Sequence, residues 1–179
     1  MKKTRILVLG PKEYPFGSGS IKGELPGGGA DVFFENLSSN LDSEKVEFHL
    51  VTQQYPGQLP FEQIGNLFVY RVYWVRGRYR TVTAIFLSFL KALRIDYDLV
   101  FTILEPPLLL GYFLAKFKRK KLYCRLGGFS GKNHKLKDMK LELAILKSFN
   151  KFVLPHSDKV IFASKTEKSR FEESMSINL

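Results

Sequence analysis

Short apolar runs and longer stripes of apolar residues at helical spacing alternate along the whole chain. Six runs rich in β-branched and aromatic residues predict strands, at Arg5–Gly10, Lys45–Thr52, Leu67–Tyr73, Tyr97–Thr102, Lys121–Leu126 and Lys159–Ala163. Between them, helices are predicted over 28–41, 81–93 and 137–152, after Glu105, and after Ser164. This alternation predicts an α/β fold, a parallel sheet flanked by helices on both faces, with Arg5–Gly10 at its centre.

The same pattern predicts which residues of the first two helices face the core. In the first helix the predicted stripe is Val32, Phe33, Asn36, Leu37 and Leu41. In the second it is Val82, Ile85, Phe86, Phe89, Leu90 and Leu93, interpreted as plain core. Glycine and proline mark the segments 11–26 and 53–66 as loops, and Ser164 with Glu167 forms a predicted capping box before the last helix.

Length and composition narrow the class of protein. The chain has 179 residues, 45% of them hydrophobic, which is enough for one globular domain. Cys124 is its single cysteine, so no internal disulfide framework is expected. Only four apolar residues follow the basic start before Gly10-Pro11, which does not fit a signal peptide, and we expect a cytoplasmic protein. No segment predicts a transmembrane helix, because 81–93 is too short and Glu105-Pro106-Pro107 interrupts the apolar stretch 99–117.

The net charge of +11 is concentrated in two segments. Residues 63–95 carry six Arg/Lys and no acid, and residues 116–140 carry ten Arg/Lys against Asp138 alone. Such segments attract phosphates, nucleic acid or an anionic membrane surface, whereas an ordinary solvated basic face is an equally good interpretation. We expect the segments Arg76–Arg80 and Lys116–Lys121 to help the protein approach anionic lipid or a lipid-linked acceptor.

Glycines at 27–29 follow the first strand and open the first predicted helix. A strand, a glycine-rich loop and a helix in this order bring backbone N–H groups and a positive helix end beside the strand's carboxyl end, which suits phosphate or carboxylate. The alternative is that these glycines only let the chain turn and pack closely.

Three other motifs do not fit their patterns. Gly17–Gly23 lacks the dinucleotide spacing, Gly127–Asn133 lacks the first glycine and the hydroxyl of a P-loop, and the three histidines lack metal-ligand spacing, so no metal is expected.

Four segments, taken in order, resemble the N-terminal domain of family 4 (group 1) retaining glycosyltransferases, which are built from two Rossmann-like domains (the GT-B architecture). Residues 6–10 with 28–32 resemble the family's opening strand and glycine loop. Residues 97–101, Tyr-Asp-Leu-Val-Phe, resemble its "YDVVH" strand. Arg125-Leu-Gly127-Gly128 resembles a strand end where many members have His-Gly, and residues 157–164 resemble "ADxVIxxS". Gly127 stands where many relatives carry histidine, so acceptor recognition differs there.

The resemblance implies a single Rossmann-like acceptor-side domain over residues 1–179, with the nucleotide-sugar domain absent from this chain. It implies a hexosyltransferase that uses a nucleotide diphosphate sugar and a glycan or lipid-linked acceptor in polysaccharide or glycoconjugate synthesis, at the inner face of the membrane and without a metal cofactor. The fragment alone is expected to be inactive. No catalytic residue is assigned; the candidate substrate- and phosphate-binding residues are Gly27, Gly28, Gly29, Glu105, Arg125, Gly127, Gly128 and Lys165.

Two other classes of protein stay open at this point. The charge and the 14% aromatic content are compatible with a nucleic-acid-binding module, although no RNA-recognition or helix-turn-helix signature supports one. A nucleotide-dependent reductase or epimerase also fits an α/β chain, but the missing dinucleotide fingerprint argues against it. Surface charge alone is an alternative role for Arg125, Lys132 and Lys165.

Overall fold

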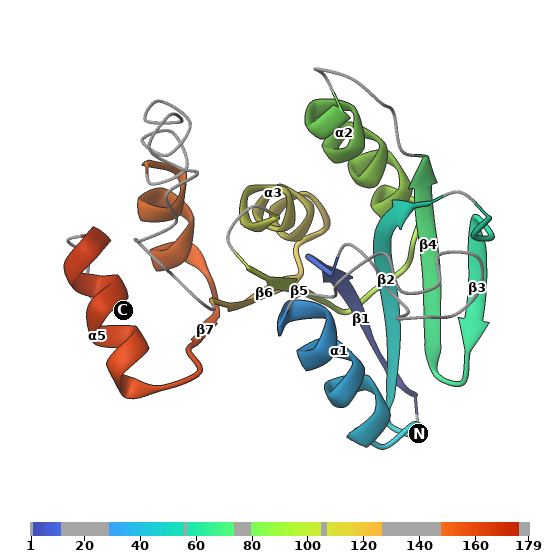
Figure 1. Cartoon of the computed structure of the whole chain (residues 1–179), viewed down its shortest axis with the longest axis horizontal. Helices are drawn as coiled ribbons and strands as arrows, with labels where there is room; N and C mark the ends of the chain where they lie inside the picture. Colours follow the sequence, from blue (N-terminus) through green and yellow to red (C-terminus); the bar gives the residue numbers. More distant parts are fainter. Residues whose placement is uncertain are drawn as a thin grey trace.

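The fold was analysed in a computed structural model, which describes residues 2–11, 29–55, 57–73, 80–104, 107–126 and 148–175. Strands and helices alternate along most of the chain (Figure 1). In chain order the elements are β1 (Thr4–Leu9), α1 (Gly29–Asn40), β2 (Val46–Gln54), β3 (Phe61–Ile64), β4 (Leu67–Tyr73), α2 (Arg80–Leu93), β5 (Leu99–Ile103), α3 (Leu108–Lys118), β6 (Lys121–Arg125), the 3₁₀ turn η2 (Leu154–His156), β7 (Lys159–Ile161) and α5 (Lys165–Met175). Residues 148–153, just before η2, are also helical.

The seven described strands form one sheet in the order β3-β4-β2-β1-β5-β6-β7. All neighbours pair in parallel except β3 and β4, and β1 is the central strand, as the sequence predicts. The Rossmann-like α/β fold is therefore confirmed. One prediction is wrong: segment 53–66 is not all loop, because Phe61–Ile64 forms the antiparallel edge strand β3, joined to β4 by a turn at Gly65 with φ of 59°.

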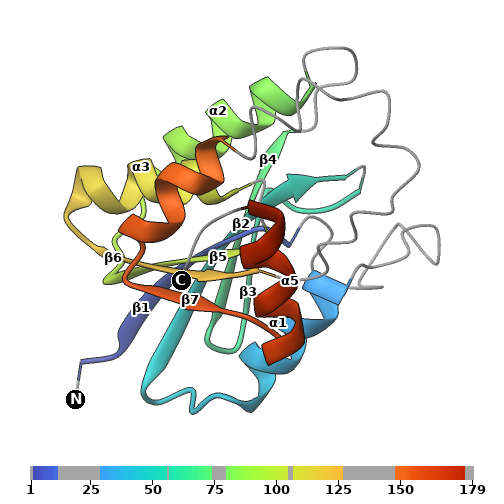
Figure 2. The ribbon, with the colours of Figure 1, turned by 90° about the vertical axis from the view of Figure 1, so that its left-hand side faces the viewer.

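Helices cover both faces of the sheet (Figures 1 and 2). On the first face, called the α1 face, Ala30 and Phe34 of α1 pack on Phe48, Leu50 and other side chains of the central strands. On the opposite face, α2, α3 and residues 148–153 form a layer, which we call the three-helix face. Its core residues include Ala92, Leu108, Leu114 and Val153, packed on the other sides of the same strands. Burial on two faces explains why the central strands are nearly continuous apolar runs.

Two aspartates hold neighbouring strands in register by the same pair of hydrogen bonds. Asp98, just before β5, accepts the Arg5 backbone N–H on its Oδ2 at 3.0 Å and donates its own N–H to the Arg5 carbonyl at 2.8 Å. Asp158, just before β7, bonds Leu122 of β6 in the same way, at 2.8 and 2.9 Å. Each carboxylate satisfies a backbone donor at the start of a strand, where the sheet offers no partner.

The buried sides of α1 and α2 differ from the predicted stripes. In α1 the deepest residue is Phe34, fully buried, and the predicted Phe33 and Leu37 also pack on the core. Val32 and Leu41, which follows the helix, are exposed. In α2 the predicted stripe is divided: Phe89 and Leu93 pack on the core, but Ile85, Phe86 and Leu90 are exposed. The interpretation of this stripe as plain core is therefore wrong, because α2 carries more apolar residues than the sheet beneath it has room to bury.

The predicted capping box at the last helix is present. Ser164 Oγ accepts the Glu167 N–H at 3.1 Å, and the Glu167 carboxylate accepts the Ala163 N–H at 2.9 Å, one residue earlier than in the standard pattern. These two bonds fix where α5 begins, four residues after β7 ends. The start of α5 therefore lies at the carboxyl edge of the sheet, near the ends of β6 and β7.

Candidate functional site

The strand order reverses direction between β1 and β5, where successive strands run away to opposite sides. In open α/β sheets ligands bind outside the carboxyl ends of the strands at such a point. Here Gly10 has φ of 133°, and a Cβ on it would overlap the carbonyl oxygen of Ile103, so the two strand ends approach each other as closely as glycine allows.

An unusual backbone conformation marks the same place. Leu104, directly after β5, is a non-glycine residue with φ of 73°. This left-handed conformation costs an L-residue about 1–2 kcal/mol, and such residues cluster at binding and catalytic sites. The Leu104 N–H donates to the Arg125 carbonyl at 3.0 Å, which holds the turn after β5 against the end of β6. The sequence gives no indication of this strain, because leucine rarely adopts a positive φ.

The start of α1 and Arg125 come together beside this reversal point. Arg125, the last residue of β6, lays its guanidinium over the ring of Phe33 at 3.8 Å from the ring centroid. Phe33 is one helical turn after Gly29, the first residue of α1. A Cβ on Gly29 would meet no atom of the described residues within 4 Å, so none of them closes this end of the helix. Two of the predicted residues, from distant parts of the sequence, therefore contribute to one location.

The electrostatics of this location favour an anion. Burial lowers the pKa of Arg125, and the Glu167 carboxylate partly offsets that change; the guanidinium nevertheless stays charged at neutral pH. No carboxylate of the described residues lies within ion-pair distance of Arg125. A half-buried cation stacked on an aromatic ring, next to the positive end of α1, forms a pre-oriented site for phosphate or carboxylate.

Lys165 is the first residue of α5, and its side chain is exposed. Because β6 and β7 are parallel and pair Arg125 with Ile161, Lys165 belongs to the same carboxyl edge as Arg125. Within the described residues no contact joins the Lys165 and Arg125 side chains, so Lys165 is an exposed cation at the periphery of the candidate site.

The other predicted site residues, Gly27, Gly28, Glu105, Gly127 and Gly128, lie outside the described residues, as does Lys132. Their assignment stays a prediction.

Other reactive side chains of the described chain have structural partners. Cys124 is buried, and burial raises the pKa of its thiol, which keeps the thiol protonated and unreactive. His49 is stacked on Phe68, and His156 Nδ1 lies 2.7 Å from the Phe152 carbonyl oxygen. Within the described ranges, no three His, Cys, Asp or Glu side chains gather closely enough to hold a metal ion.

A cavity of about 240 Å³ lies at the opposite, amino edge of the sheet. Its lining includes Arg5, His49, Lys91, Arg94 and Asp96. Because Arg5 already forms an ion pair with Asp96 at 2.6 Å, much of its charge is neutralised. The site expected at a parallel sheet is at the carboxyl edge, so we do not assign this cavity to substrate.

Comparison with known proteins decides the family. The model of "Glycosyltransferase Family 4" matches residues 27–178, which is most of the chain. The chain belongs to glycosyltransferase family 4. The family resemblance seen in the four sequence segments is thereby confirmed, and three of those segments lie at the carboxyl edge or in the strands that lead to it. No curated protein matches the sequence significantly.

A solved structure supports the fold of this family 4 domain. Sucrose-phosphate synthase from Thermosynechococcus elongatus is similar over 96% of this chain, with a TM-score of 0.63 and 12% sequence identity. The match covers 45% of that enzyme, so the chain spans less than half of its length. At this identity the likeness concerns the fold alone.

Proposed function

We propose that this chain is the acceptor-binding half of a retaining family 4 glycosyltransferase. The complete enzyme would move a hexosyl group from a nucleoside diphosphate sugar to a glycan or lipid-linked acceptor, in polysaccharide or glycoconjugate synthesis. Family membership supports the reaction class. The observation that carries the proposal to a site is the Arg125 guanidinium stacked on Phe33 beside the open start of α1.

The proposed chemistry requires stabilisation of negative charge. In sugar transfer, the bond between the anomeric carbon and the diphosphate breaks and a bond to the acceptor oxygen forms. The diphosphate leaves with the bonding electron pair and takes up the proton of the acceptor hydroxyl. Donors fixed in advance at the developing charge lower the barrier most. Arg125 and the first N–H groups of α1 are such donors, and we assign to them a phosphate or acid group at the reacting ends of the substrates.

The remaining parts of the proposal concern partners and location. The donor pocket belongs to a second domain, so this chain by itself holds the acceptor and binds nucleotide sugar weakly. Transfer needs both substrates held together across a closed cleft. We also propose a cytoplasmic location at the inner face of a membrane, supported by the net charge of +11 and by the lipid-linked acceptor that the function includes.

Calorimetry of the 179-residue chain with a panel of nucleoside diphosphate sugars tests this division of labour. We expect weak binding throughout and no transfer to any acceptor, because the donor pocket is not in this chain. Arg125→Gln should weaken the residual binding about tenfold by removing a charge-assisted hydrogen bond. Lys121→Gln, an exposed cation at the other end of β6, is the matched control and should change little.

Either of two results would contradict the proposal. Tight donor binding, or sugar transfer by this chain alone, would mean that the donor site is built from its own residues. Equal effects of Arg125→Gln and Lys121→Gln would mean that Arg125 contributes only general surface charge.

A further inference from the structure

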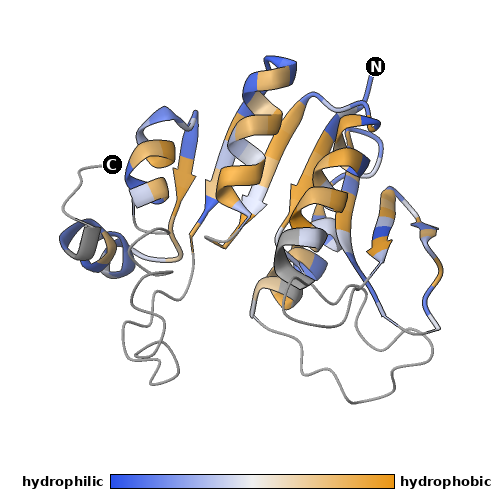
Figure 3. Ribbon diagram, turned by 90° about the horizontal axis from the view of Figure 1, so that it is seen from above, coloured by the Kyte–Doolittle hydropathy of each residue, from blue (hydrophilic) through white to orange (hydrophobic). Residues whose placement is uncertain are grey.

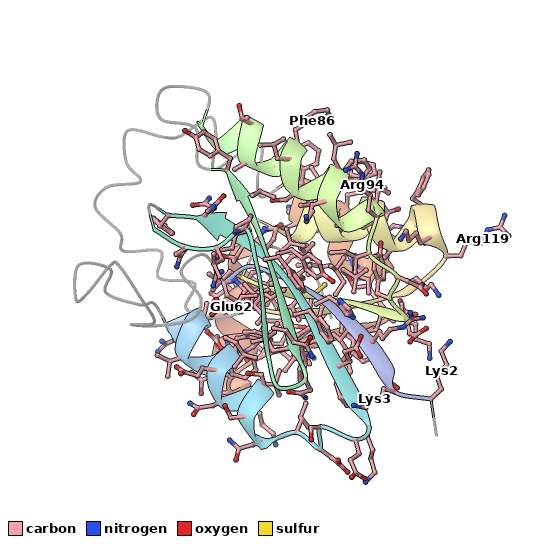
Figure 4. The ribbon with its side chains drawn as sticks, turned by 90° about the vertical axis from the view of Figure 1, so that its right-hand side faces the viewer. Lys2, Lys3, Glu62, Phe86, Arg94 and Arg119 are labelled. Atoms are coloured by element: carbon pink, nitrogen blue, oxygen red, sulfur yellow. The ribbon has the colours of Figure 1, made fainter. Side chains whose placement is uncertain are left out.

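The three-helix face carries large apolar side chains on its outer surface. Seven of them are exposed: Ile85, Phe86, Leu90, Phe113, Phe117, Phe149 and Phe152. Phe117 is 72% exposed and Phe86 is 58% exposed. Phe86 points up and away from the sheet (Figure 4). Exposed apolar groups gathered on one face mark a surface that binds something.

The charge of this face is of one sign. The helices α2 and α3 with residues 148–153 contain five Lys/Arg, at 80, 91, 116, 118 and 151, and no Asp or Glu. Arg94 and Arg119 extend the positive charge just beyond the ends of α2 and α3 (Figure 4). Three of these cations have partners within the protein: Lys118 donates to the Ile95 carbonyl at 2.6 Å, Lys91 lies over the Tyr70 ring, and Lys116 lies over the Tyr112 ring. Lys116, Arg119 and Lys151 remain exposed.

The three helices form one continuous layer. Helices α2 and α3 contact each other, and the Tyr112 ring of α3 meets the Phe152 ring edge-on at 5.5 Å between centroids. Seen from above, the helices lie side by side and contain many hydrophobic residues (Figure 3). In the described parts of the chain, no helix is long and apolar enough to cross a bilayer. A membrane would therefore be met along the helices rather than spanned by one.

We propose that the three-helix face is a membrane-contact surface that lies flat on an anionic bilayer. Its phenylalanines enter the boundary between headgroups and acyl chains, and its lysines and arginines meet the negative headgroups. Interfacial helices combine these two contributions, and each basic residue near an anionic leaflet adds about 1 kcal/mol of attraction.

Charge complementarity selects lipid over a second copy of the chain. Two such faces brought together would oppose cations with cations, since neither contributes an acid from these helices. An anionic bilayer supplies both the missing negative charge and an apolar interior. On the other side of the sheet, α1 carries two acids and no base and α5 carries three of each, so attraction to the bilayer also fixes which side of the molecule faces it.

This orientation also places the candidate site relative to the bilayer. The inference rests on the membrane part of the proposed function. The helices run along the sheet, so with the three-helix face on the bilayer the carboxyl edge opens sideways, along the membrane plane. Arg125 and the start of α1 open at this same edge, but on the α1 face, which is the side of the sheet away from the bilayer. A lipid-linked acceptor would have to extend past the edge of the sheet to reach them.

Sedimentation of the chain with lipid vesicles tests the surface. The probes are vesicles of phosphatidylcholine alone and of phosphatidylcholine with phosphatidylglycerol, each at low and high salt. We expect binding to the anionic vesicles only, weakened by salt. The double variant Phe86→Gln/Phe117→Gln should bind them at least about tenfold more weakly, because two phenyl rings no longer enter the lipid boundary. Leu59→Gln is the matched control, since Leu59 is 63% exposed away from this face and should leave binding unchanged.

Thermal unfolding of each variant confirms that it is folded, and these exposed positions should leave the midpoint nearly unchanged. Binding to neither vesicle at low salt, equal binding to both, or normal binding by the double variant would each overturn the inference. The inference would also be overturned if the chain forms a dimer or binds oligonucleotides and the double variant abolishes that interaction. The two proposals can fail separately. If the chain binds vesicles, but the chain together with its proposed donor domain transfers no sugar to a soluble acceptor, the proposed function is rejected and the membrane surface stands.

Discussion

The two faces of the sheet are covered by helices of opposite character. On the α1 face, helix α1 has two acids and no base and buries Phe34 completely against Phe48. On the three-helix face the helices carry five bases and no acid, and seven large apolar side chains lie outside the core. Both covers contain enough apolar residues to hold a helix on a sheet. The difference is that the three-helix face has more apolar side chains than the sheet buries. The side chains left over are available to contact something outside the chain.

The sharpest test of this contrast compares two phenylalanines in the two covers. Phe34→Ala should lower the free energy of unfolding by about 3–5 kcal/mol, because it leaves a cavity where the ring met Phe48. Phe86→Ala should change the free energy of unfolding by less than about 0.5 kcal/mol, because that ring is exposed to solvent. Chemical denaturation of both variants, with equal denaturant slopes, provides the measurement.

A large loss of stability in Phe86→Ala would break the comparison. It would mean that Phe86 packs against parts of the chain beyond the described residues, and that the three-helix face is a core rather than an outer surface.

A second, smaller contrast compares one glycine from each cover. A Cβ on Gly111 of α3 would overlap the Thr102 side chain on β5, which is fully buried and stiff. Overpacking of this kind costs about 1–3 kcal/mol, of which the better helix propensity of alanine returns up to about 1 kcal/mol. We expect Gly111→Ala to be destabilising and Gly29→Ala, whose Cβ meets nothing within 4 Å, to be neutral or slightly stabilising. Unfolding midpoints that fall equally in both variants would argue against the close approach of α3.

Much of the fold follows from local pattern. The strands β1, β2, β4, β5, β6 and β7 appear in the sequence as short apolar runs, because strands buried on two faces must be apolar throughout. The exception is β3, whose residues Phe-Glu-Gln-Ile lie at the edge and are mostly exposed, so they carry little of the pattern that marks a buried strand. The two aspartate clamps were also not predicted, since Asp98 and Asp158 act through pairs of strands that only the fold brings together.

Less of the candidate site follows from sequence. Arg125 and Gly29 were predicted from strand-end and helix-start patterns, and the fold brings the Arg125 guanidinium to a ring one turn from Gly29. The partner Phe33 was assigned to the core stripe, and its ring does pack on the core of the α1 face. Periodicity could not show that Arg125 would also lie over that ring. The strained Leu104 could not be predicted, because its conformation is imposed by the approach of β1, β5 and β6.

Strand β2 repeats the contrast between the two faces within consecutive residues. Phe48 and Leu50 point to the α1 face, while His49 between them points toward the cavity shared with Lys91 and Arg94 of the opposite cover. His49 is 7% exposed, its ring stacks on Phe68, and its Nε2 lies 2.6 Å from a Glu47 carboxylate oxygen. At these three positions one face of the strand therefore buries hydrocarbon, and the other buries a titratable ring.

The titration of His49 leads to the smallest expected effect, a loss of folding stability in mild acid. Burial lowers the pKa of His49 below its usual value, and the Glu47 carboxylate offsets only part of that change. A group whose pKa is lower in the folded state binds more protons when unfolded, so its contribution is complete above the unfolded pKa of about 6.5 and is lost as the pH falls below it. The unfolding midpoint should therefore fall slightly between neutral pH and about pH 5, and less so in His49→Gln, which keeps a hydrogen-bonding group but does not titrate. If both proteins show the same slope over this window, the acid response belongs to other groups, and the two faces differ in their outer surfaces but not in the cost of charging their interiors.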